Sequence, residues 1–165
     1  MAVRRVLSTT MNAKLVTEVL RALEREGVAY KVFGGVAVNI LGIARGTQDL
    51  DLFVAPLAAN IERLRRALRS VWDDPSIDEI THEDLAGDYP AIQYVPPSED
   101  FHIDIVARLG EAYSYDALET ERRALGDLVV TVVSPRQLYA MKRGTVRYKD
   151  ALDAHHLRAR YDLEE

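Results

Sequence analysis

The sequence predicts a mixed α/β (α+β) fold, with one mixed β-sheet and helices packed mainly on one side of it. Three observations lead to this fold class. The chain has 165 residues, which is the length of about one domain. Hydrophobic residues make up 48% of it, an ordinary globular content. Segments with strand and helix patterns alternate along it. We therefore treat residues 1–165 as a single domain, with a helical C-terminal segment over about 134–160.

Composition excludes several classes of protein. The chain has no cysteine, which excludes disulfides, thiolate zinc sites and cysteine nucleophiles. No apolar run approaches the roughly 20 residues that a membrane span needs. The N-terminal segment has basic residues but lacks the apolar stretch of a secretory signal. We therefore expect a cytoplasmic protein with no membrane partner.

The net charge of −5 is unevenly distributed. Residues 73–107 contain ten acidic residues and neither lysine nor arginine, which leaves 16 acidic against 21 basic residues in the rest of the chain. The acidic total argues against a polyanionic partner for the whole molecule. The basic remainder still allows a local surface that meets phosphate.

Periodicity and glycine positions define the elements of the first half of the chain. Apolar residues from Leu15 to Leu23 recur at helical spacing, and glycine is a normal helix stop. Alternating apolar residues predict strands, whereas the arginines after residue 60 are typical of a solvated helix face. The predicted elements are a helix from Thr9 or Thr10 to Gly27, a strand over 29–33, a short helix from 36 to 40 after Gly34 and Gly35, a loop over 42–48, a strand over 50–54 and a helix over 57–72.

Turn residues and caps define the second half in the same way. A proline-rich segment over 96–100 separates two apolar runs and favours a hairpin. Ser134 followed by Pro135 is typical of a helix start. The predicted elements are strands over 91–95 and 101–106, a helix over 114–125, a strand over 128–133 and a helix from 135 to about 160, divided near Gly144.

The turn after the first predicted strand carries the strongest functional signal. That strand ends in Gly34 and Gly35 and runs directly into a helix, and glycine permits a close backbone approach while a helix N-terminus attracts phosphate. Asp49 and Asp51 stand at the head of the next strand, where residues two apart point to the same face. Adjacent carboxylates repel, and bound Mg²⁺ relieves that repulsion because it takes oxygen ligands from carboxylates and phosphates.

A third acid lies in a later strand. Asp104 interrupts the apolar run 101–106, so its isoleucine neighbours face the core while Asp104 points the other way. An acid in such a strand is costly without a partner. Beside Asp49 and Asp51 it would complete a three-carboxylate metal site. Two ions about 4 Å apart stabilise the attacking and leaving oxygens of an in-line displacement.

The order of these features resembles the nucleotidyltransferase superfamily that includes polymerase beta. The shared features are a glycine pair, an intervening helix, an aspartate pair around one residue and a later strand with a single aspartate. The run from Arg45 to Leu52 further resembles the minimal bacterial nucleotidyltransferases, including AbiEii-like and MenT-like toxins. The segment from Ser134 to Asp153 is similar to the C-terminal region of that family, and contains Lys142, Lys149 and Asp150.

This resemblance implies metal-dependent transfer of an NMP from an NTP to a hydroxyl acceptor. Asp49, Asp51 and Asp104 would be the catalytic residues and the ligands of Mg²⁺ or Mn²⁺. The resemblance further assigns nucleotide contacts to Gly34, Gly35, Arg45, Thr47, Lys142, Lys149 and Asp150. The acceptor stays open among RNA, protein and a small molecule. The toxin-like relatives imply an antitoxin partner.

Several of these residues also have a purely structural interpretation. Arg45 would pair with a surface acid, and the basic C-terminal helix would form local ion pairs such as Arg147 with Asp150. His102 shares a strand face with Asp104 and is within reach of the metal site, whereas adjacent His155 and His156 are more typical of a helix end.

Two alternatives to an active enzyme also remain. The first is a catalytically weak nucleotide-binding module or toxin–antitoxin partner with the same fold. The second is a structural domain with incidental carboxylates, which a separation of those carboxylates by more than roughly 8 Å would favour.

Overall fold

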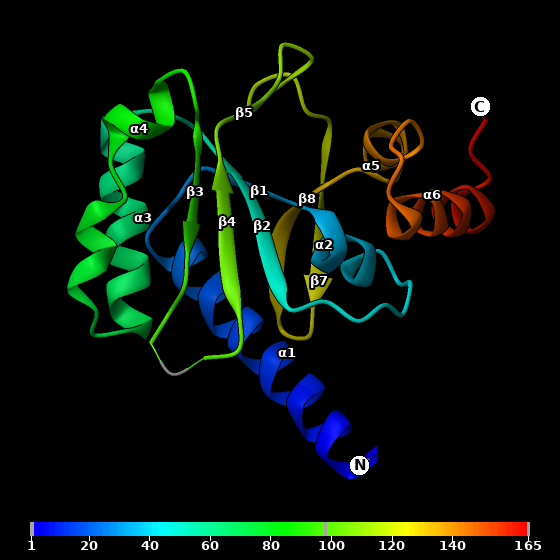
Figure 1. Ribbon diagram of the computed structural model, residues 1–165, viewed down its shortest axis with the longest axis horizontal. Coiled ribbons are helices and arrows are strands. Elements are labelled where there is room, and N and C mark those ends of the chain that lie inside the picture. Colours follow the sequence, from blue (N-terminus) through cyan, green and yellow to red (C-terminus); the bar gives the residue numbers. More distant parts are fainter. Residues whose placement is uncertain (1, 98, 165) are drawn as a thin grey trace.

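A six-stranded mixed β-sheet forms the centre of the protein (Figure 1). The computed structural model describes residues 2–97 and 99–164, with side chains from residue 13 onward. The strand order is β3-β4-β2-β1-β8-β7, and a separate pair of short strands, β5 and β6, lies beyond it. The strands are β1 (Tyr30–Phe33), β2 (Asp49–Val54), β3 (Ala91–Tyr94), β4 (His102–Val106), β5 (Arg108–Leu109), β6 (Tyr113–Ser114), β7 (Thr120–Leu125) and β8 (Leu128–Val133).

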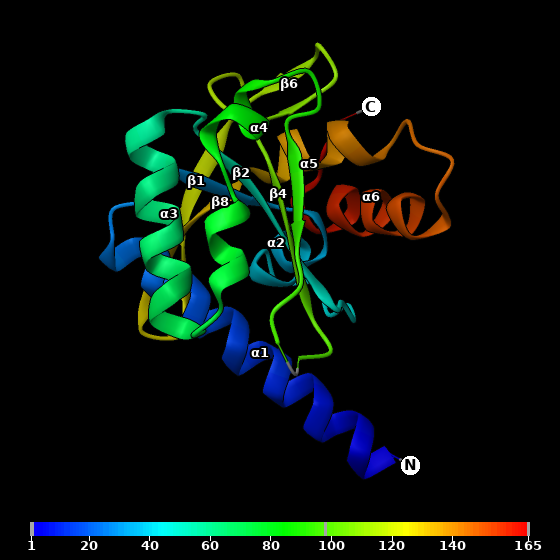
Figure 2. The ribbon, with the colours of Figure 1, turned by 60° about the vertical axis from the view of Figure 1, so that its left-hand side comes forward.

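All of the α-helices except the short α4 belong to two groups, which are seen apart in Figure 2. In one group, α1 and α3 pack against each other along the sheet. In the other group, α2 follows β1 directly, and α5 and α6 pack against each other beside it. The helices are α1 (Ala2–Arg25), α2 (Gly34–Ile40), α3 (Ala58–Val71), α4 (His82–Ala86), α5 (Pro135–Lys142) and α6 (Tyr148–Tyr161), with a 3₁₀ helix η1 (Pro75–Glu79).

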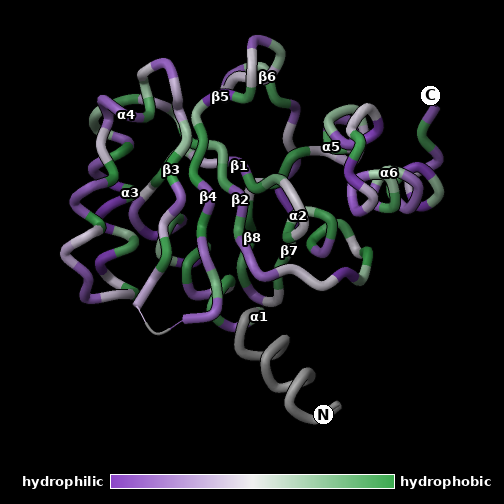
Figure 3. Tube along the Cα trace, viewed as in Figure 1, coloured by the Kyte–Doolittle hydropathy of each residue, from purple (hydrophilic) through white to green (hydrophobic). Residues whose placement is uncertain are grey.

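The two faces of the sheet differ in chemistry because side chains alternate along each strand. One face is apolar and meets α1 and α3. On β2 it carries Leu50 and Leu52, both fully buried, and on β3 it carries Tyr94, whose ring packs edge-on against Trp72 at the end of α3. The other face carries Asp49 and Asp51. Figure 3 shows the hydrophobic residues concentrated in the central strands.

Strand pairing brings distant acids together. The β2 and β4 strands run parallel, and their register places Asp49 opposite His102 and Asp51 opposite Asp104. Antiparallel β3 and β4 confirm the predicted hairpin, with Gln93 opposite Asp104. Directly opposed residues share a face of the sheet. The polar side chains of β2 and β4 therefore form one patch.

The helix predicted over residues 114–125 is wrong. Residues 120–125 form β7, which pairs antiparallel with β8 from Thr120 opposite Val133 to Leu125 opposite Leu128. Glutamate, arginine, alanine and leucine favour a helix locally, but pairing with β8 overrides that preference. Gly126, with φ 64°, takes the first central position of a two-residue hairpin turn, and this turn was the signal for a strand.

Other boundaries differ less. The helix α1 begins at Ala2 rather than after Thr9 or Thr10, because the segment contains no glycine or proline to interrupt it. The prediction did not include η1 and α4, which lie within the acidic segment 73–107. The division of the C-terminal helix near Gly144 is confirmed by α5 and α6. Among the described residues, no helix is long and apolar enough to cross a membrane.

Candidate active site

The turn between β1 and α2 shapes the centre of the site. Gly34 has φ 70°, a left-handed conformation that side chains rarely adopt. A Cβ atom at Gly34 would overlap the carboxylate of Asp51, and one at Gly35 would overlap the guanidinium of Arg45. Both glycines thus leave space for a charged side chain of the protein itself.

Three carboxylates converge beside this turn. Asp51 faces Phe33 on β1 and Asp104 on β4, so it lies between two strands of the sheet. Burial raises the pKa of Asp51 to about 8, and the negative charges of Asp49 and Asp104 contribute to that rise. Lys142 acts in the opposite direction. The ionised form of Asp51 is therefore unfavourable unless positive charge lies nearby, and a bound cation would supply that charge.

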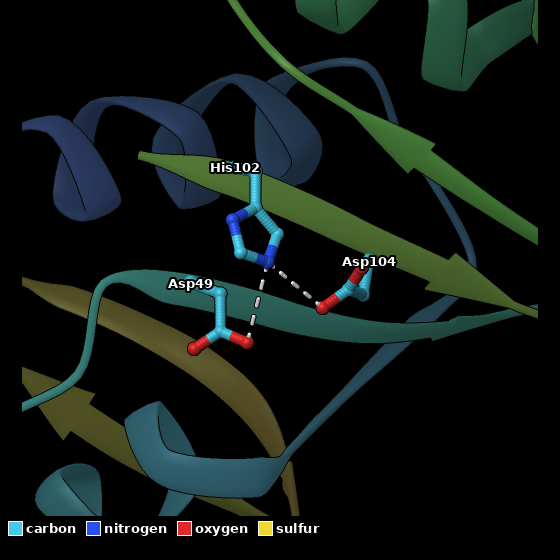
Figure 4. A group of neighbouring side chains, drawn as sticks. All are labelled: Asp49, His102 and Asp104. Carbon is cyan, nitrogen blue, oxygen red and sulfur yellow. Dashed lines mark ion pairs between the residues drawn. The ribbon is translucent and has the colours of Figure 1, made fainter. Parts of the chain in front are cut away.

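The outer part of this group is a candidate metal site (Figure 4). The Nε2 atom of His102 lies 3.5 Å from Oδ2 of Asp49 and 3.3 Å from Oδ2 of Asp104. One ligand atom from each of these three residues lies within 4.8 Å of the others. Thr47 donates a hydrogen bond of 2.9 Å to Oδ1 of Asp49, which orients that carboxylate. Carboxylate oxygens and an imidazole nitrogen suit a divalent cation.

A buried ion network joins the C-terminal helices to the loop before β2. Nζ of Lys142 lies 3.1 Å from Asp150 and 2.8 Å from Asp153, and all three side chains are nearly inaccessible to solvent. Asp153 also pairs with Nε of Arg45 at 2.9 Å. Buried charges need such partners, because an uncompensated ion in the interior is costly.

The pKa of Asp150 is held below its ordinary value. Burial of this carboxyl works against its ionisation, but hydrogen bonds from Thr145 and Lys142 outweigh the effect of burial. Asp150 therefore stays charged next to Lys142. Arg147 lies at the edge of the network, 4.0 Å from Asp150, with a mostly exposed side chain.

These elements enclose a cleft of about 410 Å³. A cleft of this size is within the range of small-molecule sites. It lies between the carboxylates of the sheet and the cations of the C-terminal helices. Its lining includes Gly34, Gly35, Arg45, Asp49, Asp51, Asp104, Leu138, Met141, Lys142, Arg147 and Asp150.

Most of the residues singled out from the sequence meet at this cleft. Thr47 contacts Asp49 but lines a neighbouring apolar pocket. Lys149 lies apart, in a pocket with Tyr148 and His156 on α6. Its assignment to the nucleotide stays a prediction.

Two contributors were missing from the predicted site. His102 was considered only as an alternative, although the register with β2 places it at the carboxylates. Asp153 anchors both Lys142 and Arg45. Its signal was present in the sequence, because it follows Asp150 by three residues and so shares its helix face.

Comparisons with solved structures bear on the fold. The solved structure of ANT(2")-Ia in complex with adenylyl-2"-tobramycin matches with a TM-score of 0.58 and 13% sequence identity, over 92% of this chain and 90% of that chain. A solution structure of the antibiotic-resistance factor ANT(2'')-Ia matches at 19% identity with a TM-score of 0.48, over 93% and 92% of the two chains. The first of these likenesses shows a shared fold. Curated protein sequences gave no significant match.

Membership of a family rests on the sequence itself. Residues 29–164 match the family described as "Nucleotidyl transferase AbiEii toxin, Type IV TA system". The matched range begins just before β1 and contains the glycine turn, all three carboxylates and the C-terminal ion network. The chain therefore belongs to the AbiEii family of nucleotidyltransferase toxins.

Proposed function

We propose that this nucleotidyltransferase binds the NTP in the cleft between β2, β4 and α5 and depends on divalent cations. The observation that carries the proposal is the convergence of Asp49, Asp51 and Asp104 on one face of the sheet, beside a glycine turn. A structural domain with incidental carboxylates does not explain this gathering, since like charges repel unless a cation joins them.

The reaction follows from this arrangement. The acceptor hydroxyl oxygen forms a bond to the α-phosphorus of the NTP while the bond from that phosphorus to the β-phosphate oxygen breaks, and pyrophosphate leaves. Asp104, on the cleft wall, assists removal of the hydroxyl proton. Asp49, Asp51 and Asp104 would hold Mg²⁺ or Mn²⁺, which supplies charge neutralisation for the attacking and leaving oxygens when bound.

The opposite wall of the cleft offers positive charge to the triphosphate. Arg45, Lys142 and Arg147 all line it. Lys142 already shares its charge with Asp150 and Asp153, so it contributes as part of a fixed network. Arg147 has a mostly exposed side chain and can move toward the phosphates. Positioning and electrostatics of this kind account for most of the catalysis of phosphoryl-type transfers.

The acceptor is a hydroxyl group, for which RNA, protein and small molecules are the candidate classes. The family description also leads us to propose an antitoxin partner. We also propose that the protein acts in the cytoplasm, and the use of NTP as a substrate supports this location.

A labelling experiment tests the proposal. The purified chain is incubated with each α-labelled NTP, with Mg²⁺ or Mn²⁺, and with total RNA or lysate, and the labelled product is identified. We expect transfer by the wild type and a loss of at least roughly a hundredfold in Asp49→Ala. The matched control is Asp88→Ala, which removes an exposed carboxylate. Full activity of Asp49→Ala, or NTP binding without transfer to any acceptor, would contradict the proposal.

A further inference from the structure

We infer that His102 is a direct metal ligand, and that the cluster Asp49–His102–Asp104 is a nitrogen-containing site that takes Mn²⁺ or a similar transition metal in preference to Mg²⁺. This inference rests on the proposed function, because it concerns the cation that the carboxylates hold. It adds a residue and a metal class to the three-aspartate arrangement.

The backbone fixes the imidazole beside the carboxylates. His102 is the first residue of β4, and the parallel register with β2 places it opposite Asp49. Asp104 follows two residues later on the same strand and therefore on the same face. Figure 4 shows the ring of His102 extending toward both carboxylates, with Nε2 between them. This placement depends on strand pairing rather than on a mobile loop.

The distances from His102 to the two carboxylates fit coordination of a common metal ion better than direct hydrogen bonds. Nε2 lies 3.5 Å from the Asp49 oxygen and 3.3 Å from the Asp104 oxygen. Both distances exceed the 2.7–3.2 Å typical of N–H···O hydrogen bonds. Ligands at about 2.1 Å from a common ion lie roughly 3 Å or more from one another. All three ligand atoms lie within 4.8 Å of one another.

The cluster has its own access to solvent. Asp49 and Asp104 line the cleft, whereas His102 is not among the residues that line it. About a third of each of the three side chains is exposed (35%, 32% and 31% for Asp49, His102 and Asp104). A hydrated ion can therefore reach the group without passing the half-buried Asp51. The cluster remains adjacent to the cleft through its two carboxylates.

The donor set indicates the class of metal. Mg²⁺ prefers oxygen ligands and keeps several waters, whereas imidazole suits first-row transition metals such as Fe²⁺, Ni²⁺ and Zn²⁺. Mn²⁺ is the member of that series that best suits carboxylates, so it matches a site in which two of the three ligands are carboxylates. Two carboxylates and one imidazole thus favour a transition metal over Mg²⁺. The competing explanation is that His102 acts only as a counter-ion of the two aspartates.

Pulsed EPR of bound Mn²⁺ separates these explanations. The full chain is loaded with Mn²⁺ in the absence of nucleotide, and electron spin-echo modulation is recorded. We expect ¹⁴N modulation from a coordinated imidazole in the wild type, and its loss in His102→Gln. The matched control is His155→Gln, which replaces an exposed histidine of α6 and should keep the signal. Wild-type protein made with ¹⁵N-histidine should also lose the ¹⁴N modulation, which identifies histidine without any variant.

Metal titrations give the second readout. His102→Gln should weaken Mn²⁺ binding by roughly tenfold or more, while Mg²⁺ binding changes much less. Absence of ¹⁴N modulation in the wild type, or equal loss of Mn²⁺ and Mg²⁺ affinity in the variant, would overturn the inference. Neither readout uses NTP. Transfer activity without nitrogen coordination would leave the proposed function standing, and nitrogen coordination without transfer would leave the metal site standing.

Discussion

Asp51 lies where three carboxylates meet, and the β1–α2 turn beside it has no room for a side chain. The charge of Asp51 is unfavourable in its surroundings, because burial and two acidic neighbours all favour its protonated form. Gly34 provides the space that the carboxylate occupies. Under the proposed function, the charge that Asp51 needs to hold a cation is therefore one that the metal-free fold disfavours.

Gly34→Ala should strongly reduce activity through a steric effect. The new methyl group would overlap the Asp51 carboxylate, and the backbone conformation itself would cost roughly 1–3 kcal/mol. We expect transfer to fall by roughly a hundredfold, the scale of a misplacement near the reacting atoms. Gly126→Ala is the matched control, since Gly126 also has a positive φ but has no atom within 4 Å of a built Cβ. Equal transfer rates of the two variants per folded molecule would contradict the steric explanation.

Asp51→Asn should stabilise the metal-free protein in a pH-dependent way. The pKa of Asp51 is about 8 in the folded protein against an ordinary value near 3.8, so the folded state binds more protons between these limits. The contribution of Asp51 to the free energy of unfolding of the wild type therefore falls as pH rises from about 4 to about 8. In EDTA at pH 8, the variant should melt at least about 3 °C above the wild type, and the difference should shrink toward pH 5. The exposed Asp88→Asn should show no such trend, and a difference that is constant with pH would count against the assigned cause.

At the scale of elements, one buried aspartate connects three segments. Asp153 on α6 holds Lys142 at the end of α5 and Arg45 in the loop before β2. That loop also contains Thr47, which orients Asp49. Packing of α6 is thereby linked to the position of the Asp49 carboxylate. The two C-terminal helices complete the site as well as lining it.

Asp153→Ala should destabilise the protein and loosen the loop over 42–48. Removing the shared acid leaves Arg45 unpaired and Lys142 with one partner, and loss of a buried partner typically costs about 3–5 kcal/mol. Urea unfolding measures the stability, and hydrogen exchange measures opening of the loop. Asp127→Ala breaks an exposed pair with Arg21, and because solvent screens such a pair the variant should lose much less stability than Asp153→Ala. Similar effects of the two variants would mean that the network is not a structural link.

At the scale of the whole molecule, the sheet separates stability from chemistry. Its apolar face packs on α1 and α3, and its other face bears the carboxylates at the cleft. The acidic residues of the segment 73–107 are likewise divided between the solvent-exposed surface and the site. Several acids of the segment 73–107, including Asp73, Asp78 and Glu79, are exposed on the surface, whereas Asp104 from the same segment reaches the site.

Ligand binding at this cleft should stabilise the entire fold, since strands and C-terminal helices both line it. At ligand concentrations near a hundred times Kd, binding contributes about 2.7 kcal/mol. For a chain of this size, that corresponds to a rise in Tm of roughly 5–10 °C. Thermal melts with NTP and Mn²⁺ should show this rise, and EDTA or Asp49→Ala should remove it. An equal rise in Asp49→Ala would place the nucleotide elsewhere.

Much of the fold could be predicted from the sequence because the determining signals are local. Three signals depend only on residues close in the chain. They are the glycines after β1, the alternation of apolar and polar residues in β2 and β4, and the Ser134–Pro135 start of α5. The segment over 120–125 could not be assigned in this way, because its helix-forming residues become a strand only by pairing with β8.

By itself, the sequence determined the glycine turn, the aspartate pair and the single aspartate in a later strand, and so the family resemblance. Only the tertiary structure decided which side chains meet. The parallel register of β2 and β4 places Asp104 opposite Asp51 and His102 opposite Asp49, although the two residues of each pair are 53 positions apart along the chain. The packing of α5 against α6 likewise brings Lys142 next to Asp150 and Asp153. The physical reason is that burial makes unpaired charges costly, so the packed fold selects their partners from distant parts of the chain.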